Sequence, residues 1–248
     1  MSTETIRSSL GSTPTPVFDE TLEKLKKVSV TTITGALARL GITNAYMQDV
    51  PPRTKACNFA GTAFTMRTVP TREDIVTASR GRPSLHRQSF IKVGKNQCLV
   101  FDARGEQETG VLGDIYAAQI KANGGVALIT DGCTRDIPEM EEVGLPIFAR
   151  GVSGNGFGTR HLAADQNVPI QCGGVLVMPG DVVVGSEIGV VVIPSALAEK
   201  VAEEGANTDS RDAFSREKVL SGTVTVEQAF PLKPELLAEY EEWRKTHG

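Results

Sequence analysis

The amino-acid sequence predicts a single α/β domain in which helices cover a sheet. Helical spacing of apolar residues dominates the first 40 residues, the centre alternates strand, helix and strand, and short apolar runs separated by Gly, Pro and Asp follow. This order of elements favours one α/β domain. Of the 248 residues, 40% are hydrophobic and 23% are charged, a composition that suits a globular protein with a sizeable core.

The N-terminal part predicts a mobile arm followed by two amphipathic helices. Residues 1–17 are rich in Ser, Thr and Pro and carry almost no apolar anchors. A first helix is expected to begin near Asp19, because apolar residues there recur at helical spacing with Lys and Glu between them. These apolar residues are Phe18, Leu22, Leu25 and Val28. A second helix can be capped by Thr31 or Thr32 and is expected to end at Gly41.

Short strands and helices account for most of the remaining chain. Strands are expected over residues 59–69, 97–102, 146–149, 168–171, 175–177, 182–185 and 190–193. Helix starts or helical segments are expected over residues 71–74, 138–142 and 196–206. A last amphipathic helix carries Leu236, Leu237, Tyr240 and Trp243 on one stripe. This stripe can form an interface or pack back on its own domain.

The central stretch from Gly113 to Glu139 organises the chain. Residues 114–123 are expected to form a helix that ends at Asn123-Gly124-Gly125, and residues 126–130 a buried parallel strand. The apolar face of this helix is expected to hold Ile115, Ala118 and Ala122, with Ala117 and Ile120 beside them. Because the helix and strand form one αβ unit, Gly113-Asp114 and Arg135-Asp136 should meet at the same edge of the sheet.

Two collinear motifs resemble a known family. Asp114, twenty residues, Arg135-Asp136, two residues and Glu139 form the first, and PGDVVVGSEIGVVVIP over residues 179–194 forms the second. Together they resemble the 4-hydroxy-4-methyl-2-oxoglutarate/4-carboxy-4-hydroxy-2-oxoadipate aldolase family, which also contains the RraA-like regulators of ribonuclease E. The likeness runs from about Phe18 to Ile193. It implies a three-layer sandwich resembling the swivelling phosphohistidine-domain fold, assembled as homotrimers or homohexamers with sites between subunits.

The resemblance and the residue chemistry together divide the chain and name a reaction. We expect an arm at residues 1–17, an RraA-like aldolase domain at 18–226 and a C-terminal helical extension at 227–248. The expected reaction is cleavage of a 4-hydroxy-2-oxo acid to pyruvate plus an aldehyde or oxo acid, with oxaloacetate decarboxylation as a side activity. The substrate can be of the 4-hydroxy-4-methyl-2-oxoglutarate type or a 2-keto-3-deoxy sugar acid. The TVPTRED segment at residues 68–74 resembles RraA-like proteins associated with sugar-acid catabolism.

Such a cleavage leaves an enolate whose charge needs either a Schiff-base lysine or a divalent metal. Only Lys92 has apolar neighbours on both sides, and it sits among basic residues, so the metal route is favoured. Asp136 offers a hard oxygen suited to Mg²⁺ or Mn²⁺, and by resemblance it is the single direct ligand. Arg135 suits a substrate carboxylate or enolate oxygen.

The start of the central helix supplies the remaining expected site residues. The N–H groups of Ile115 and Tyr116, after Gly113, should bind the substrate carboxylate. Asp114 should act through water on the proton of the C4 hydroxyl. Structural alternatives stay open, because an Arg-Asp pair is often a surface ion pair and an Asp before a helix is often its cap.

Other acids have weaker grounds for a role in the site. An acid such as Glu139 is common in the first turn of any helix. In related proteins an acid from a neighbouring subunit supports the waters of the metal, and Glu203, Glu204 and Asp209 are candidates.

Two other classes of function compete with the aldolase. Residues 158–170 around His161 faintly resemble a phosphohistidine loop, but a phosphocarrier needs an exposed histidine and a phosphorylating domain. The second alternative is a non-catalytic regulator that binds ribonuclease E. Asp114 discriminates against it, because a pure binding module needs no acid-base residue opposite Arg135.

Composition argues against several partners. A net charge of -4 and the lack of a basic stripe make nucleic acid an unexpected partner. The four widely spaced cysteines predict neither a zinc site nor a disulfide framework. With no signal peptide and no apolar run of membrane-spanning length, a soluble, cytoplasmic protein is expected, without a membrane partner.

Overall fold

A mixed sheet forms the centre of the computed structural model, which describes residues 11, 13–78, 81 and 83–247. Within this part of the chain the strand order is β4 (Ile147–Val152), β3 (Ala127–Thr134), β2 (Gln97–Asp102), β1 (Phe59–Pro70), β8 (Val182–Ser186) and β9 (Gly189–Ile193). Strands β1 to β4 run parallel, whereas β8 and β9 are antiparallel. The far end of β1 also pairs antiparallel with β5 (His161–Gln166). The predicted closing hairpin is therefore confirmed as β8 and β9.

The helices are distributed along the whole described chain, before, between and after the strands. Their bounds are α2 (Asp19–Leu25), α3 (Val30–Arg39), α4 (Glu73–Ala78), α5 (Leu85–Lys92), α6 (Asp114–Ala122), α7 (Ile137–Val143), α8 (Ala198–Leu220), α9 (Val226–Ala229) and α10 (Leu237–His247). Short 3₁₀ turns are η1 (Phe157–Thr159), η2 (Ser195–Leu197) and η3 (Pro234–Leu236). A separate two-stranded sheet pairs β6 (Ile170–Cys172) with β7 (Val175–Val177). Among the described helices, none is both long and apolar enough to cross a membrane.

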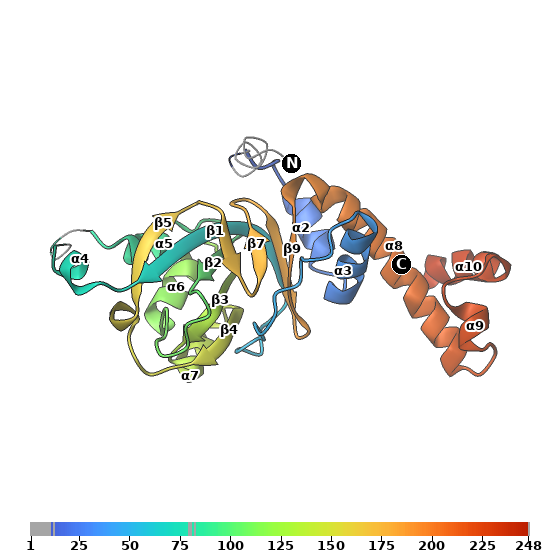
Figure 1. Ribbon diagram of the computed structural model, residues 1–248. Coiled ribbons are helices and arrows are strands. Elements are labelled where there is room, and N and C mark those ends of the chain that lie inside the picture. The colour runs from blue at the N-terminus through green and yellow to red at the C-terminus, as the bar shows by residue number, and fades with distance from the viewer. Residues whose placement is uncertain (1–10, 12, 79–80, 82, 248) are drawn as a thin grey trace.

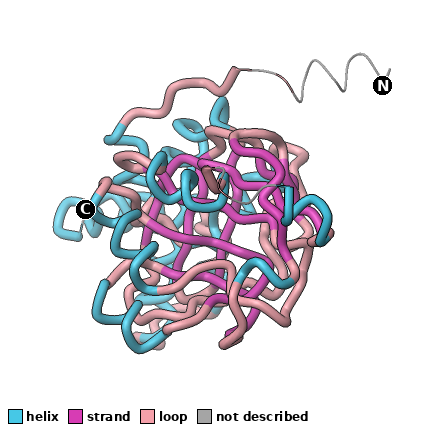
Figure 2. The backbone as a smooth tube through the Cα atoms, turned by 90° about the vertical axis from the view of Figure 1, so that its left-hand side faces the viewer, coloured by secondary structure: helices cyan, strands magenta, loops and turns pink. Residues whose placement is uncertain are grey.

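The alternation of side chains along β1 explains the layers. Successive residues of a strand point to opposite faces of the sheet. Ala60 packs with α2, α3 and α8, and Phe64 and Met66 pack with α5, α6 and α7, so helices cover one face. Phe59 and Ala63 point the other way, onto β6, β7 and the segment around Met47. In the described part of the chain, helices thus pack on one face of the sheet, and β6 and β7 pack on the other. Figure 2 shows the strands in the middle of the body with helices at its periphery.

Helix α6 buries a different face from the predicted one. Ala117 and Ile120 are fully buried against the sheet, whereas Ile115 is 76% exposed and Ala118 and Ala122 are exposed. The apolar residues fall on two stripes, and only the stripe of Ala117 and Ile120 packs into the core beneath the sheet. The predicted face of Ile115, Ala118 and Ala122 is therefore wrong for the single chain.

Two elements are longer than their local pattern predicts. Strand β3 continues past residue 130 to Thr134, because its end pairs with Gly151 and Val152 of β4. The buried Asp131 carboxylate in this extension accepts from backbone N–H groups of the loop after β2, from Ala103 at 2.8 Å and Gly105 at 3.1 Å. Helix α8 continues past residue 206 to Leu220. The sequence there has low helix propensity, but buried Phe214 packs against Tyr240 of α10. Tertiary contacts override local preference in both elements.

Helix α8 carries the chain away from the sheet. It passes α2 and α3 and leads to α9 and α10 at the right of Figure 1. Trp243 of α10 donates its indole N–H to Glu217 of α8 at 2.8 Å, and its ring lies 5.8 Å from that of Phe214. The Trp243 stripe therefore packs on its own chain. The expected boundary between 226 and 227 falls inside α9.

The predicted N-terminal arm is described only in part. Residues 1–10 and 12 lie outside the described part of the chain. Beyond them, the backbone N–H of Thr15 donates to the Ser195 hydroxyl at 3.0 Å, and Pro14 lies against Gly180. This end of the arm therefore contacts the body of the protein.

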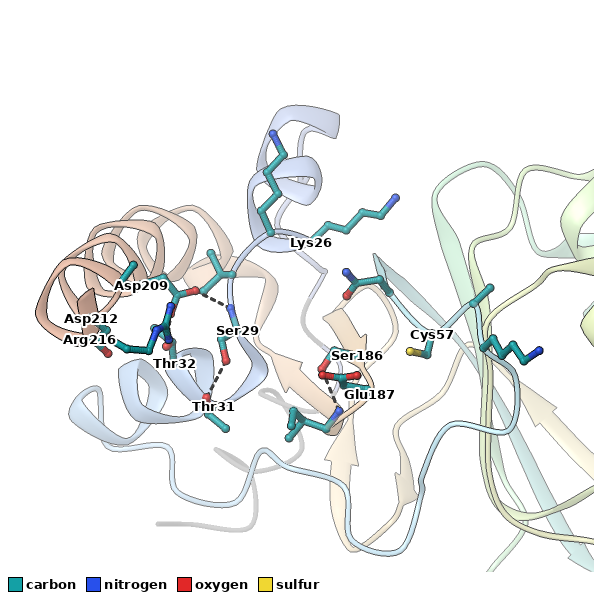
Figure 3. Close-up of a pocket in the computed structure, with 17 residues that line it drawn as sticks. Lys26, Ser29, Thr31, Thr32, Cys57, Ser186, Glu187, Asp209, Asp212 and Arg216 are labelled. Carbon is teal, nitrogen blue, oxygen red and sulfur yellow. Dashed lines mark hydrogen bonds between the residues drawn. The ribbon is translucent and has the colours of Figure 1, made fainter. Parts of the chain in front are cut away.

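Asp209 of α8 holds the start of α3, as Figure 3 shows. Its carboxylate accepts from the backbone N–H of Ser29 at 2.7 Å and from the Thr32 hydroxyl at 2.5 Å. We expect Asp209→Ala to lower the free energy of unfolding by about 1 to 2 kcal/mol, because a charged acceptor for two donors is lost. Chemical denaturation gives the measurement.

Asp212→Ala is the matched control for this prediction. Asp212 lies on α8 near Asp209, and burial together with the charge of Asp209 raises its pKa, so its charge is unfavourable in the folded chain. Its removal should change stability by less than about 0.5 kcal/mol. Equal losses in the two variants would show that Asp209 does not hold α3.

Candidate active site

Two segments meet at the carboxyl ends of the parallel strands. The backbone N–H of Val111, in the loop that leads to α6, donates to Cys133 O at 2.8 Å, and that of Arg135 donates to Leu112 O at 3.2 Å. These bonds place the start of α6 beside the end of β3. The predicted proximity of Gly113-Asp114 and Arg135-Asp136 is confirmed.

The junction of these segments forms a pocket of about 240 Å³. All the residues predicted for the site line it: Gly113, Asp114, Ile115, Tyr116, Arg135 and Asp136. His86, the backbone from Gly110 to Leu112, and Phe157 complete the wall. The volume lies just below the roughly 300 to 1,000 Å³ of pockets for drug-sized ligands, so a small ligand suits it.

Asp136 has an unusual backbone conformation. It lies in the left-handed region, with φ 57° and ψ 42°, immediately before α7. A non-glycine residue there is strained by about 1 to 3 kcal/mol and needs support from its surroundings. The carboxylate does not cap α7, is 29% exposed and accepts from Arg135 Nε at 3.0 and 3.2 Å. The backbone thus aims Asp136 into the pocket.

Gly113 gives the Asp136 carboxylate its space. A Cβ added to Gly113 would lie 2.2 Å from Asp136 Oδ2. Real Cβ atoms do not approach that closely, so any side chain at residue 113 would displace the carboxylate. The φ of Gly113 is -122°, which every residue can adopt. Close approach, and not backbone freedom, is the reason for glycine here.

Arg135 presents an incompletely used guanidinium. Its side chain is 43% exposed, and within the described chain only Nε forms hydrogen bonds, both to Asp136. The two terminal nitrogens are free to bind an anion in the pocket. Arg135 and Asp136 therefore form an ion pair, which was the structural alternative to a catalytic role, but this ion pair lines a pocket.

The start of α6 offers further anion-binding groups. Gly113 is the N-cap of α6 and has no side chain that could accept from the free N–H groups. The first backbone hydrogen bond of the helix runs from the N–H of Ala117 to Gly113 O at 3.2 Å. The N–H groups of Ile115 and Tyr116 precede it and lack helical partners. Asp114 is the first helical residue, so it does not cap α6.

His86 is a lining residue that the sequence did not reveal. Its Nε2 lies 2.6 Å from Val111 O, and its ring stacks on Phe157 with centroids 3.7 Å apart and planes at 6°. Burial lowers its pKa to about 4. The sequence patterns did not predict helix α5, which carries His86. A local signal for this helix is Ser84, whose side chain caps it by accepting from the backbone N–H of Arg87.

The weaker acidic candidates do not line the pocket. Glu139 is exposed on the outer side of α7, and Asp209 bonds to the start of α3. Glu203 is exposed and Glu204 lies 3.8 Å from Lys200 on α8. Any part played by these three residues of α8 at a neighbouring subunit's site stays a prediction.

His161 cannot act as a phosphocarrier in this conformation. It is 1% exposed, in β5, where Arg104 Nη2 donates to Nδ1 at 3.2 Å. Nε2 lies 3.1 Å from Glu106 Oε2 without being aligned for a hydrogen bond, and burial lowers the pKa of His161 to about 4. The resemblance to a phosphohistidine loop is therefore misleading here.

A larger hollow of about 1,080 Å³ lies elsewhere, between the α2–α3 junction, residues 55–58, the β8–β9 turn and α8 (Figure 3). Its wall mixes Lys26 and Lys55 with Glu187 and Asp212. None of the residues of the central motif lines it. The candidate site is therefore the smaller pocket, which the residues of the central motif line.

Comparison with known proteins identifies the family that the two sequence motifs resemble, the one from Asp114 to Glu139 and the one at residues 179–194. The model of the RraA-like family, described as Aldolase/RraA, matches residues 30–192. The chain belongs to this family. A protein of Halalkalibacterium halodurans named "Putative 4-hydroxy-4-methyl-2-oxoglutarate aldolase" is 34% identical over 150 residues, which cover 58% of this chain and 67% of that protein. The resemblance predicted from the motifs is thus confirmed.

Two solved structures of similar proteins support the RraA-like fold. An uncharacterised protein of Pseudomonas syringae pv. tomato has a TM-score of 0.79 at 26% identity, covering 89% of this chain and 97% of its own. Streptomyces coelicolor RraAS2, described as an unusual member of the RNase ES inhibitor RraA family, has a TM-score of 0.72 at 29% identity. That match covers 82% of this chain and 98% of RraAS2.

The contact between Gly113 and Asp136 can be tested without any assay of function. We expect Gly113→Ala to cost about 1 to 3 kcal/mol in free energy of unfolding, because the new methyl group overlaps the carboxylate. In an Asp136→Ala background the same change should cost less than half as much, since the overlapping oxygen is gone. Denaturant unfolding of the four proteins measures this coupling.

Gly156→Ala is the control for the Gly113 cycle, because a Cβ at residue 156 meets nothing within 4 Å. An equal cost of Gly113→Ala in both backgrounds would contradict the geometry.

Proposed function

We propose that this chain is a divalent-metal-dependent lyase that cleaves a 4-hydroxy-2-oxo acid to pyruvate and an aldehyde or second oxo acid. The observation that carries the proposal is the convergence of Asp114, Arg135 and Asp136 with the N-terminus of α6 in one small pocket. The names of the aldolase-like relatives support the same class.

The 2-oxo acid end of the substrate has a matching anion site. The N–H groups of Ile115 and Tyr116 bind its carboxylate at the positive end of α6. Arg135 directs its terminal nitrogens to the carboxylate or to the oxygen that becomes the enolate. Both groups are fixed by the fold before substrate binds, which is the condition for electrostatic stabilisation of a developing charge.

Asp136 would hold Mg²⁺ or Mn²⁺. Among the described residues no cluster of three His, Cys, Asp or Glu side chains forms a closed metal cage. A cation that keeps most of its waters needs only one or two carboxylates, and the partly exposed carboxylate of Asp136, which lines the pocket beside Gly113, fits that requirement. When bound, the metal polarises the substrate carbonyl and offsets the enolate charge.

Asp114 handles the proton of the C4 hydroxyl. Its carboxylate lines the pocket and is not used as a helix cap. Through one water it can accept the proton that the hydroxyl loses as the C3–C4 bond breaks. Decarboxylation of oxaloacetate reaches the same pyruvate enolate without this proton transfer, so it is expected as a side activity.

The Schiff-base route lacks a lysine in the pocket. Lys92 is exposed at the end of α5, and its Nζ donates to Gln166 Oε1 at 2.9 Å. Of the described residues that line the pocket, none is a lysine. This supports metal-assisted chemistry.

A non-catalytic regulator of ribonuclease E is the second candidate. It draws on the likeness to RraAS2, a member of a family of RNase ES inhibitors by its description. Such a role requires a binding surface but none of the pocket's acid-base groups.

A homotrimer or homohexamer remains part of the proposal. The exposed face of α6, formed by Ile115, Ala118 and Ala122 beside the pocket, is a suitable contact surface for another subunit. The swivelling fold implied by the family resemblance likewise stays a prediction.

Pyruvate release with and without metal tests the proposed function. We expect the purified protein to release pyruvate from 4-hydroxy-4-methyl-2-oxoglutarate or 2-keto-3-deoxygluconate with Mg²⁺ or Mn²⁺, and EDTA to abolish it. Asp136→Ala should also lose Mn²⁺ binding measured by electron paramagnetic resonance, because its only assigned ligand is gone. Full activity in EDTA, with pyruvate trapped on a lysine by borohydride, would overturn the proposal.

A further inference from the structure

His86 is a polar residue of the pocket whose side chain the proposed chemistry leaves unused. Its Nε2 lies 2.6 Å from the carbonyl oxygen of Val111. A carbonyl only accepts, so Nε2 carries the ring proton and Nδ1 is the unprotonated nitrogen. Since Nε2 is occupied, Nδ1 is the ring atom left to bond a ligand, and it can only accept.

Aromatic rings fix the orientation of this acceptor. Phe157 stacks on the His86 ring at 3.7 Å, while Phe90, Phe101 and Tyr116 meet it edge-on at 4.8, 5.9 and 5.8 Å. Only 8% of the residue is exposed. A ring held this tightly cannot turn to exchange its nitrogens, so Nδ1 is a fixed acceptor on a residue that lines the pocket.

The neutral ring of His86 disfavours a second carboxylate of the substrate beside it. Burial lowers its pKa to about 4, with smaller effects from nearby His161 and Arg87, so the ring is neutral at physiological pH. Among the described residues of the wall, Arg135 is the one Lys or Arg, and the 2-oxo acid end uses it. A distal carboxylate would meet a neutral acceptor, which repels it, whereas a distal hydroxyl could donate to that acceptor.

We infer that His86 Nδ1 accepts a hydrogen bond from a substrate hydroxyl beyond C4, so that the pocket selects 2-keto-3-deoxy sugar acids over dicarboxylic 4-hydroxy-2-oxo acids. His86 is then a specificity-determining residue. The inference rests on the proposed function for its substrate class, but the contact itself can be tested without turnover.

The kinetic test compares 2-keto-3-deoxygluconate with 4-hydroxy-4-methyl-2-oxoglutarate. The wild-type protein should have the higher kcat/KM for the sugar acid. His86→Phe keeps the aromatic packing but removes both the Nδ1 acceptor and the Nε2–H donor to Val111 O. The lost acceptor should lower kcat/KM for the sugar acid about tenfold, while the lost donor, which affects both substrates, should change that for the dicarboxylic acid less than about threefold. His86→Gln, which restores an acceptor oxygen, should recover part of the loss.

His161→Phe is the matched control. His161 packs on Phe157, with ring centroids 5.3 Å apart, but does not line the pocket. Its substitution should leave the ratio of the two kcat/KM values unchanged. A wild-type preference for the dicarboxylic acid, or an equal loss on both substrates in His86→Phe, would overturn the inference.

Nuclear magnetic resonance of ¹⁵N-labelled histidine provides the second readout. Asp114→Asn with Mg²⁺ is titrated with 2-keto-3-deoxygluconate, so that cleavage is slow. Both His86 and His161 should show the Nε2–H tautomer. Val111 O accepts from Nε2 of His86, and Arg104 donates to Nδ1 of His161. Only His86 Nδ1 should shift towards the value of a hydrogen-bonded nitrogen.

The two tests separate the inference from the function on which it rests. An unmoved His86 Nδ1 at saturating sugar acid overturns the inference, even if pyruvate is released. A shifted His86 in a wild-type protein that cleaves neither substrate supports the contact and refutes the lyase. The titration uses the native histidine, so it decides the question even if His86→Phe fails to fold.

Discussion

The candidate site depends on the pairing of the loop before α6 with the end of β3. Across this junction the backbone N–H of Val111 donates to Cys133 O and that of Arg135 donates to Leu112 O, and the Thr134 hydroxyl adds a third bond to Leu112 O at 3.2 Å. These bonds hold Gly113 directly against the Asp136 carboxylate, with no room for a side chain. The helix N-terminus, the guanidinium of Arg135 and the aimed carboxylate therefore share one pocket as a result of backbone geometry.

Sequence patterns predicted the elements whose signal is local. Residues 97–102 match β2 to the residue, α6 begins at Asp114 as expected, and the β8–β9 hairpin follows its glycine and apolar runs. Elements that depend on contacts with residues far away in the sequence could not be predicted from local patterns. Helix α5 is short and mostly polar, and β5 is defined by its pairing with β1.

The predicted site residues assemble, but their arrangement was not visible in the sequence. Spacing alone brings Asp114 near Arg135, whereas the left-handed backbone of Asp136 has no sequence signature. His86 lies on helix α5, whose sequence has no strong apolar periodicity. A single histidine without other polar motif residues nearby is as typical of a buried core as of a functional site. The face of α6 was misjudged because two apolar stripes compete, and only the tertiary fold decides between them.

The central claim is that Asp114 performs proton transfer and does not merely begin a helix. Asparagine keeps the size of this side chain and removes its basic oxygen, and Gly113, not Asp114, is the cap of α6. The decisive measurement is the ratio of retro-aldol cleavage to oxaloacetate decarboxylation in purified, folded Asp114→Asn. We expect cleavage to fall about a hundredfold or more, and decarboxylation, which needs no hydroxyl deprotonation, to fall far less. Retention of both activities, or their equal loss, would contradict the account.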